Sequence, residues 1–163
     1  MAAAFRRVRL NGYSRLVFIR PAIPAERDAL EALQLRASLG NEGDREALLR
    51  HPDAIDLPME QITAGSVFVV EQHGALVGFS AIVAREDGDT ELDALFVEPS
   101  TQRQGVGKRL VEHCAKVARS KGSTCLHVVG NPHAEQFYLA CGFSIIGKFD
   151  TRFGPGLLMR LPL

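Results

Sequence analysis

The chain has 163 residues, enough for one domain with a hydrophobic core, and 46% of them are hydrophobic. Nineteen basic residues balance nineteen acidic ones, so no overall electric field attracts nucleic acid or a membrane surface. No apolar run approaches the length of a membrane span. Three cysteines without paired spacing predict neither a disulfide framework nor a zinc site. They indicate buried thiols in a reducing compartment, so we expect a cytoplasmic protein.

The N-terminal segment is basic: the first 20 residues include five arginines and no acidic residue. Such a start is compatible with an organelle presequence, but it lacks the long apolar region of a secretory signal. We expect residues 1–14 to form a poorly ordered extension before the first strand. Because the chain contains no internal repeat, low-complexity tract or linker, residues 1–163 are predicted to form a single domain.

The first half of the chain alternates between strand and helix patterns. A β-rich run is stopped by Pro21 and Pro24, and the helical pattern that follows places Leu30, Leu33 and Ala37 on one face. We expect the following elements in this half. They are a strand over 15–22, helices over 25–39 and 42–51, an irregular connection over 52–65, and strands over 66–72, 75–86 and 90–98. The dipeptide at 73–74, His-Gly, predicts a tight hairpin between the first two of these three strands.

From Val106 the apolar period becomes that of an amphipathic helix, which Gly122 should end. The remaining segments are predicted as a strand over 123–131, a helix over 132–142, and strands over 143–149 and 156–163 around a Gly-Pro-Gly turn. This order predicts an α+β fold with a mixed, mostly antiparallel central sheet of about seven strands flanked by about four helices. One strand–helix–strand crossover is expected within it.

The stretch "TQRQGVGKRL", residues 101–110, is typical of a glycine-rich turn that opens a helix and holds a phosphate. It is not a P-loop, because Gln102 occupies the first glycine position and Arg109 replaces the hydroxyl residue that binds magnesium. It is not a Rossmann fingerprint either, since Leu110 stands at the third glycine position. Taken alone, two glycines two residues apart indicate only the start of a helix.

The surrounding sequence makes the turn more specific. The pattern Q-x-x-G-x-G, at Gln102, Gly105 and Gly107, follows a strand ending in "LFVEP", and "STCLHVVGN" and "FYLACGF" come about two dozen residues later. This combination resembles the GNAT superfamily of N-acetyltransferases, over essentially the whole chain. The resemblance implies acetyl-CoA as co-substrate, with its pyrophosphate held by backbone N–H groups at a helix N-terminus. The residues implied are Arg103, Gln104, Gly105, Val106, Gly107 and Lys108. No metal is expected, because the turn lacks a magnesium-binding hydroxyl.

The resemblance also assigns roles on the two strands beside the turn. The main chain of Leu95, Phe96 and Val97 is expected to pair with the pantetheine arm, and one of its N–H groups to stabilise the developing oxyanion. Asn131 matches a residue that contacts the cofactor, and it is also placed to cap the helix that begins at Pro132. Tyr138 matches the tyrosine that faces the coenzyme sulfur and protonates the departing thiolate.

A general base is needed, because an alkyl amine is mostly protonated at neutral pH. Glu91 is the first candidate, since it lies six residues before Val97, a spacing that resembles that of the histone-acetyltransferase branch. His127 is the second, near the position where the ribosomal-protein branch has a glutamate. Asp93, on the same strand face as Glu91, is the third candidate and a substrate-binding one.

The predicted function is transfer of an acetyl group to a primary amine of a small-molecule or peptide acceptor, by direct attack in a ternary complex. Two alternatives stay open: a non-catalytic acyl-CoA-binding or regulatory module, and a protein N-terminal or lysine acetyltransferase. The acceptor pocket is expected to come largely from residues 36–65, where no side chain identifies the acceptor. We expect a monomer or homodimer and neither a nucleic-acid nor a membrane partner.

Overall fold

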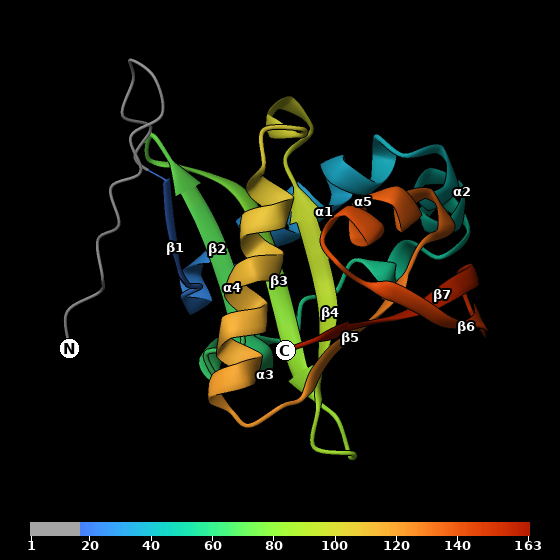
Figure 1. Ribbon diagram of the computed structural model, residues 1–163. Coiled ribbons are helices and arrows are strands. Elements are labelled where there is room, and N and C mark those ends of the chain that lie inside the picture. The colour runs from blue at the N-terminus through green and yellow to red at the C-terminus, as the bar shows by residue number, and fades with distance from the viewer. Residues whose placement is uncertain (1–16) are drawn as a thin grey trace.

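The computed structural model describes residues 17–163, which form a seven-stranded sheet with helices on both faces (Figure 1). The strand order is β1-β2-β3-β4-β5-β7-β6. All neighbouring strands are antiparallel except β4 and β5, which α4 connects as a parallel crossover. The strands are β1 (Val17–Pro21), β2 (Val67–Gln72), β3 (Ala75–Ala84), β4 (Thr90–Val97), β5 (Cys125–Gly130), β6 (Ser144–Thr151) and β7 (Gly154–Pro162).

Five α-helices are found within residues 17–163, and two separate hydrophobic layers place them on opposite faces of the sheet. They are α1 (Arg27–Leu39), α2 (Glu42–Arg50), α3 (Met59–Thr63), α4 (Val106–Ser120) and α5 (Glu135–Ala140). Leu30, Leu33 and Ile62 form one layer beneath α1 and α3. Val111 and Tyr138 belong to the other layer, beneath α4 and α5. The predicted α+β fold and mostly antiparallel sheet are therefore confirmed.

Local signals located most elements correctly. His73 and Gly74 have φ angles of 52° and 78°, the two positive values that a type I′ hairpin turn requires, so the predicted hairpin is confirmed. Two details were wrong. The connection over 52–65 contains the short helix α3, whose Ile62 is buried against the core. The last hairpin turns at Arg152 and Phe153, and the Gly-Pro-Gly segment lies inside β7.

A β-bulge interrupts the pairing of β3 with β4. Ala81 lies opposite Ala94 and Ile82 opposite Leu92, so Asp93 is left without a partner on β3. The extra residue reverses the alternation of side chains along β4. Leu92 faces the α4 layer, whereas Ala94, two residues later, packs in the α1 layer.

The predicted poorly ordered extension, residues 1–14, lies outside the described residues. Within them, none of the helices is both long and apolar enough to cross a membrane.

Candidate active site

The strands β4 and β5 run side by side for only two residues. Their register joins Thr90 to Leu126 and Glu91 to His127, and no further pairs follow within the described part of the chain. From Leu92 to Val97, β4 keeps its neighbour β3 on one side but has no strand partner on the other (Figure 1). An open strand edge of this kind can pair with an extended ligand as it would with another strand. The predicted residues Leu95, Phe96 and Val97 all lie on this edge.

The glycine turn connects the end of β4 to α4. Gly105 precedes the first residue of α4 with φ 83°, a left-handed conformation that side-chain-bearing residues rarely adopt. A Cβ at Gly105 would meet no atom within 4 Å, so the space above this residue is open. Arg103 also has a positive φ, 61°. The side chain of Gln102, the first residue of the motif, donates a hydrogen bond to the carbonyl of Val97 (3.4 Å) and so ties the turn to β4.

The N-terminus of α4 presents backbone donors. The N–H of Arg109 donates to the carbonyl of Gly105 (3.1 Å), the first hydrogen bond of the i to i−4 type in this helix. The N–H groups of Val106, Gly107 and Lys108 precede it and point along the helix axis. The Val106 side chain is buried in the core, so only its main chain is available. The side chain of Lys108 is exposed.

The missing side chain of Gly107 allows close packing. A Cβ there would lie 3.1 Å from two ring carbons of Phe137 and 3.6 Å from the Val97 side chain. Glycine at this position therefore lets α5 approach α4 closely. Gly78 on β3 allows a similar close approach of α4 to the sheet, because a Cβ there would lie 3.0 Å from the Val106 side chain. The turn is thus held by close packing on both sides.

Asn131 follows β5 and uses both ends of its amide. Its Oδ1 accepts a hydrogen bond from the N–H of His133 (2.9 Å), which is the predicted cap at the start of the helical segment. Its Nδ2 donates to Oδ1 of Asp44 on α2. Asp44 was not among the sequence candidates, and nothing local marks it, because its partner is 87 residues away.

Tyr138 is almost fully buried, with 7% of its surface exposed. Its ring makes edge-on contacts with Phe137 and Phe143 and lies against Gly130 of β5. Burial, with smaller contributions from the charges of Cys141 and Asp44, raises its pKa above the usual tyrosine value, so the hydroxyl stays protonated at neutral pH. Within residues 17–163 the hydroxyl makes no hydrogen bond, and it is not among their buried unpartnered atoms. An accessible, protonated hydroxyl thus lies beside the end of β5.

The structure brings together the first two candidates for the base, Glu91 and His127. They are register partners on the last paired rung of β4 and β5, so their side chains project from the same face of the sheet. Leu126 and Val128 belong to the α4 layer, so His127 faces the α1–α3 side. A carboxylate oxygen of Glu91 accepts a hydrogen bond from Nη1 of Arg85 (3.2 Å). Glu91 and Arg85 also line a surface hollow of about 460 Å³.

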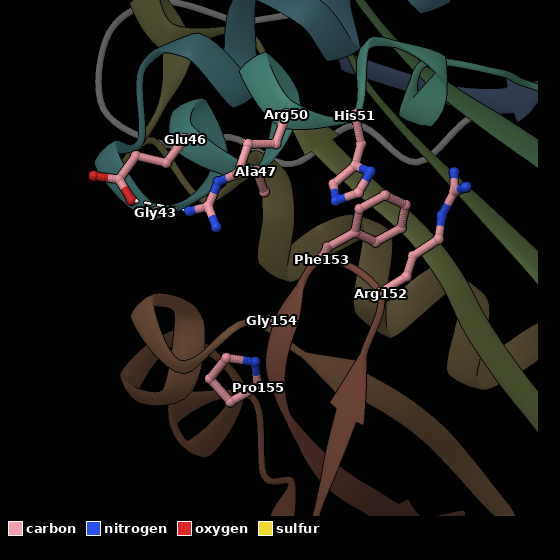
Figure 2. Close-up of a pocket in the computed structure, with 9 residues that line it drawn as sticks. All are labelled: Gly43, Glu46, Ala47, Arg50, His51, Arg152, Phe153, Gly154 and Pro155. Carbon is pink, nitrogen blue, oxygen red and sulfur yellow. Dashed lines mark hydrogen bonds and ion pairs between the residues drawn. The ribbon is translucent and has the colours of Figure 1, made fainter.

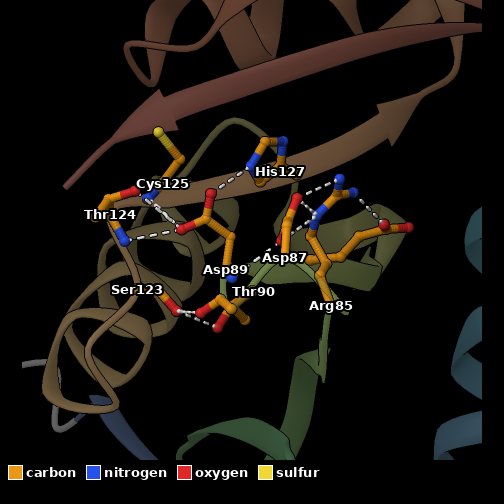
Figure 3. Close-up of polar contacts among 10 residues, drawn as sticks. Arg85, Asp87, Asp89, Thr90, Ser123, Thr124, Cys125 and His127 are labelled. Atoms are coloured by element: carbon orange, nitrogen blue, oxygen red, sulfur yellow. Dashed lines mark hydrogen bonds and ion pairs between the residues drawn. The ribbon is translucent and has the colours of Figure 1, made fainter.

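His127 is joined to an acid that the sequence analysis did not consider. Its Nε2 lies 2.9 Å from Oδ2 of Asp89, and the other carboxylate oxygen, Oδ1, accepts hydrogen bonds from Thr124 and Cys125 (Figure 3). Donor atoms of Asp89, Cys125 and His127 lie within 4.8 Å of one another, a set that could hold a metal ion. Both carboxylate oxygens of Asp89 already take part in hydrogen bonds with protein groups. The geometry is therefore that of a hydrogen-bond network rather than of a metal site.

Asp93 is separated from the other two candidates by the β4 bulge. It is exposed on the α1–α3 side, and Oδ2 accepts a hydrogen bond from Nε2 of Gln61 on α3 (3.0 Å). The carbonyl oxygen of Gln61, Oε1, is buried and lacks a donor among the described residues. The exposed carboxylate of Asp93 presents acceptor atoms that suit an N–H group of a ligand.

A hollow of about 290 Å³ lies between α2 and the turn that joins β6 to β7 (Figure 2). The predicted acceptor segment supplies part of its wall, including Glu46, Arg50 and His51. The other part comes from the last hairpin, which sequence reasoning missed. The ring of Phe153 contacts His51 edge-on (centroids 5.5 Å apart), and the guanidinium of Arg152 lies 4.5 Å from the centre of the Phe153 ring. The lining therefore combines aromatic surface with basic side chains.

Comparison with known proteins relates this geometry to one family. The model of the acetyltransferase (GNAT) family matches residues 30–143. A peptidyl-lysine N-acetyltransferase, YjaB of Salmonella typhimurium, is 40% identical over 60 residues. That match spans 37% of this chain and 40% of the length of YjaB.

Solved structures share the fold at low sequence identity. A GCN5-related N-acetyltransferase from Rhodopseudomonas palustris aligns with a TM-score of 0.73 at 19% identity, over 90% of this chain and 95% of that one. The PaiA N-acetyltransferase of Thermoplasma acidophilum, solved in complex with coenzyme A, aligns with a TM-score of 0.72 at 17% identity. That alignment covers 90% of this chain and 99% of that one. These likenesses extend the agreement in fold over nearly the whole chain.

Proposed function

Because the chain belongs to the acetyltransferase (GNAT) family, we propose that it transfers the acetyl group of acetyl-CoA to a primary amine, by direct attack in a ternary complex. The observation that carries the proposal is the unpaired edge of β4 from Leu92 to Val97, which leads from the N-terminus of α4 to the polar side chains at Glu91 and His127. A thin, extended cofactor arm fits an edge of this kind. The complex of PaiA with coenzyme A is in accord with this choice of ligand.

The cofactor side of the site begins at the glycine turn. The N–H groups from Arg103 to Lys108 are proposed to hold the pyrophosphate, with the open space over Gly105 admitting it. The exposed side chains of Arg103 and Lys108 add positive charge there. The arm then pairs with the main chain of Leu95, Phe96 and Val97, and one of these N–H groups stabilises the oxyanion of the tetrahedral intermediate. Asn131 completes the cofactor contacts from the end of β5.

Proton transfers are proposed on the two faces of the sheet. The amine approaches from the α1–α3 face and loses a proton to a base at Glu91 or His127. The C–N bond forms first and gives the tetrahedral intermediate; its collapse then breaks the C–S bond, and the thiolate takes the proton of the Tyr138 hydroxyl on the α4 face. The hydroxyl of Tyr138 is protonated at neutral pH, so this proton is present. Asp93 is proposed to bind the acceptor rather than to act as base, because its exposed carboxylate is held in place by the hydrogen bond from Gln61 and lies beyond the bulge from Glu91 and His127.

The acceptor is proposed to enter over the hollow between α2 and the last hairpin. A peptide acceptor with a lysine side chain is one specific case, which the match to the peptidyl-lysine acetyltransferase YjaB favours. A non-catalytic acyl-CoA-binding module is the alternative from another class. The unpartnered hydroxyl of Tyr138 argues against it, since binding alone does not require that group.

One assay decides between these functions. Release of the CoA thiol is measured with acetyl-CoA and a panel of amines, amino acids, polyamines and lysine peptides, while calorimetry with coenzyme A measures binding separately. Thiol release that depends on an amine supports the proposed enzyme. Binding without release for every amine would favour the module, and absence of binding would refute both.

A further inference from the structure

The carboxylate of Asp89 is held rigidly in front of His127. Oδ1 accepts hydrogen bonds from the N–H of Thr124 (2.8 Å), the hydroxyl of Thr124 (3.1 Å) and the N–H of Cys125 (3.0 Å). Oδ2 is left facing Nε2 of His127, 2.9 Å away (Figure 3). Only 17% of the Asp89 side chain and 14% of the His127 side chain are exposed. Both groups are therefore fixed in place by partners from the start of β5.

The protonation of this pair follows from its contacts. The hydrogen bond to His127, followed by those from the N–H groups of Cys125 and Thr124, holds the pKa of the Asp89 carboxyl far below its usual range. At neutral pH Asp89 is thus a carboxylate, which can only accept hydrogen bonds. The hydrogen between the two groups must then belong to Nε2 of His127. In the neutral imidazole, the lone pair is consequently on Nδ1.

The Nδ1 atom of His127 is free to accept a proton from a ligand. Within residues 17–163 it makes no hydrogen bond, and it is not among their buried unpartnered atoms. The register partners of His127 are two charged residues, Glu91 on β4 and Arg160 on β7. Glu91 already accepts a hydrogen bond from Arg85, which in turn binds Asp87. Of the two base candidates on this rung, Glu91 is engaged by the guanidinium of Arg85 (3.2 Å), whereas Nδ1 of His127 has no hydrogen-bond partner within residues 17–163.

We infer that Asp89 is a positioning residue: it locks His127 in the Nε2–H tautomer, so that Nδ1 acts as the base toward the acceptor amine. This inference rests on the proposed function and goes beyond it by choosing between Glu91 and His127. In the step, the amine forms a C–N bond with the acetyl carbon and gives its proton to Nδ1; the tetrahedral intermediate then collapses, the C–S bond breaks and the thiolate takes the proton of Tyr138. His127 becomes an imidazolium that the Asp89 carboxylate stabilises through Nε2–H, as a carboxylate does in hydrolase triads.

The position of His127 along β5 suits this role. Gly130, against which Tyr138 lies, is three positions further along β5, so the two strand positions are about 10 Å apart at 3.3 Å per residue. That spacing leaves room for a thioester and an attacking amine between them. The base then lies on the acceptor face and the acid on the cofactor face, which matches the directions in which the amine arrives and the thiolate leaves.

The tautomer can be observed without any substrate. The ¹⁵N shifts of the His127 ring, in protein labelled at histidine and assigned with His127→Gln, distinguish Nε2–H from Nδ1–H at neutral pH with a metal chelator present. We expect Nε2–H in the wild type. Asp89→Asn keeps an acceptor for Thr124 and Cys125 but offers an amide donor to His127, so the ring should switch to Nδ1–H. Asp87→Asn is the matched control, because Asp87 accepts hydrogen bonds from Arg85 and from the N–H of Asp89 without contacting His127, and asparagine keeps an acceptor for that N–H.

Kinetics then test the role. Asp89→Asn and His127→Gln should each lower kcat by roughly 100-fold with unchanged KM for acetyl-CoA, and the double variant should lose no more, because the two residues act as one unit. Asp87→Asn should keep wild-type turnover. Thermal melts confirm that each variant is folded.

A wild-type ring in the Nδ1–H form overturns the inference whatever the activity. A ring that switches in Asp89→Asn while turnover stays normal overturns the positioning role and transfers the base role to Glu91. If the wild type has the Nε2–H ring and binds acetyl-CoA but acetylates no amine, the proposed function is wrong and the base role falls with it, whereas the Asp89–His127 arrangement stands.

Discussion

The ring of Tyr138 lies on the main chain of Gly130, where a Cβ would come within 3.2 Å of two ring carbons. Gly130 ends β5 and Tyr138 belongs to α5, so the missing side chain allows the helix to bring the ring down onto the strand. The position of the hydroxyl therefore depends on a glycine eight residues earlier. Two of the predictions below follow from this contact.

Tyr138→Phe removes only the hydroxyl. We expect kcat to fall by about 100-fold, the lower end of the range for general acid catalysis, because a thiolate is a fair leaving group without help. The affinity for acetyl-CoA should hardly change, since the hydroxyl acts mainly in the transition state. Because the hydroxyl has no hydrogen-bond partner among the described residues, stability should also stay within about 0.5 kcal/mol of the wild type. Single-turnover kinetics and thermal melts measure both; a normal rate would remove Tyr138 from the mechanism.

Gly130→Ala should displace the Tyr138 ring by a few tenths of an ångström. We expect a loss in kcat of about tenfold, smaller than that of Tyr138→Phe, because misplacing a reacting group costs less than removing it. In the double variant with Tyr138→Phe, the alanine should cost nothing further in turnover. An additive loss would show that Gly130 matters for a reason other than the hydroxyl.

Gly105→Asp should abolish binding of coenzyme A. The change places a negative charge at the N-terminus of α4, where the diphosphate is proposed to sit, and calorimetry in excess chelator measures the loss. Part of any effect comes from strain, since φ is 83° at this position. Gly74→Asp is the matched control: its φ is 78° and the space around it is equally open, but it lies in the hairpin between β2 and β3. A folded Gly105→Asp protein with unchanged affinity would refute the assignment of this turn.

Gly107→Asp is expected to lose binding for two reasons. The carboxylate repels the diphosphate, and the Cβ pushes Phe137 away from α4, so this variant should also melt earlier than Gly105→Asp. Gly107→Ala separates the two effects, because it has the same contact without the charge. It should lower the melting temperature while keeping measurable affinity for coenzyme A.

Stability should fall on acidification. Hydrogen bonds from Arg36 hold the pKa of the Glu98 carboxyl below its usual value, so the ionised form is favoured by folding. Its contribution is complete above the unfolded pKa of about 4.3 and disappears as pH falls through the folded pKa. Glu98→Gln should therefore cost about 0.5 kcal/mol at pH 7, the usual value for a pair with one exposed partner, and almost nothing at pH 3. Urea unfolding at both pH values, with the exposed Glu86→Gln as control, tests this.

Cys114 should resist thiol reagents in the folded protein. It is fully buried in α4, its Sγ lies 3.2 Å from the hydroxyl of Ser80, and burial raises the pKa of its thiol to about 11. Cys125 and Cys141 are only half-buried, so the expectation of three buried thiols was wrong for them. At pH 8 we expect these two to react with a disulfide reagent well before Cys114 does, as mass spectrometry of labelled peptides can show. Equal labelling of all three would indicate that α4 opens readily.

Short-range sequence patterns made much of the fold predictable. The change of period at Val106 located α4, and the His73–Gly74 dipeptide located a hairpin, because helix spacing and turn conformations depend on residues close together in the chain. The Q-x-x-G-x-G turn and the segment around Tyr138 indicated the family for the same reason: each is a short, continuous block. The last turn was misplaced because the Gly-Pro-Gly segment is a strong local turn signal that pairing of β7 with β6 overrides.

The sequence by itself determined the order of the elements, the glycine-rich turn at the start of α4 and a short set of candidates for the acid and base. Tertiary structure alone decided how those candidates are joined. Asp89 meets His127 across 38 residues, Asp44 meets Asn131 across 87, and the bulge at Asp93 exists only against β3. None of these contacts leaves a periodic or local signal. They arise when the sheet brings separate strand ends to one place, where burial and hydrogen bonding then decide which groups are ionised.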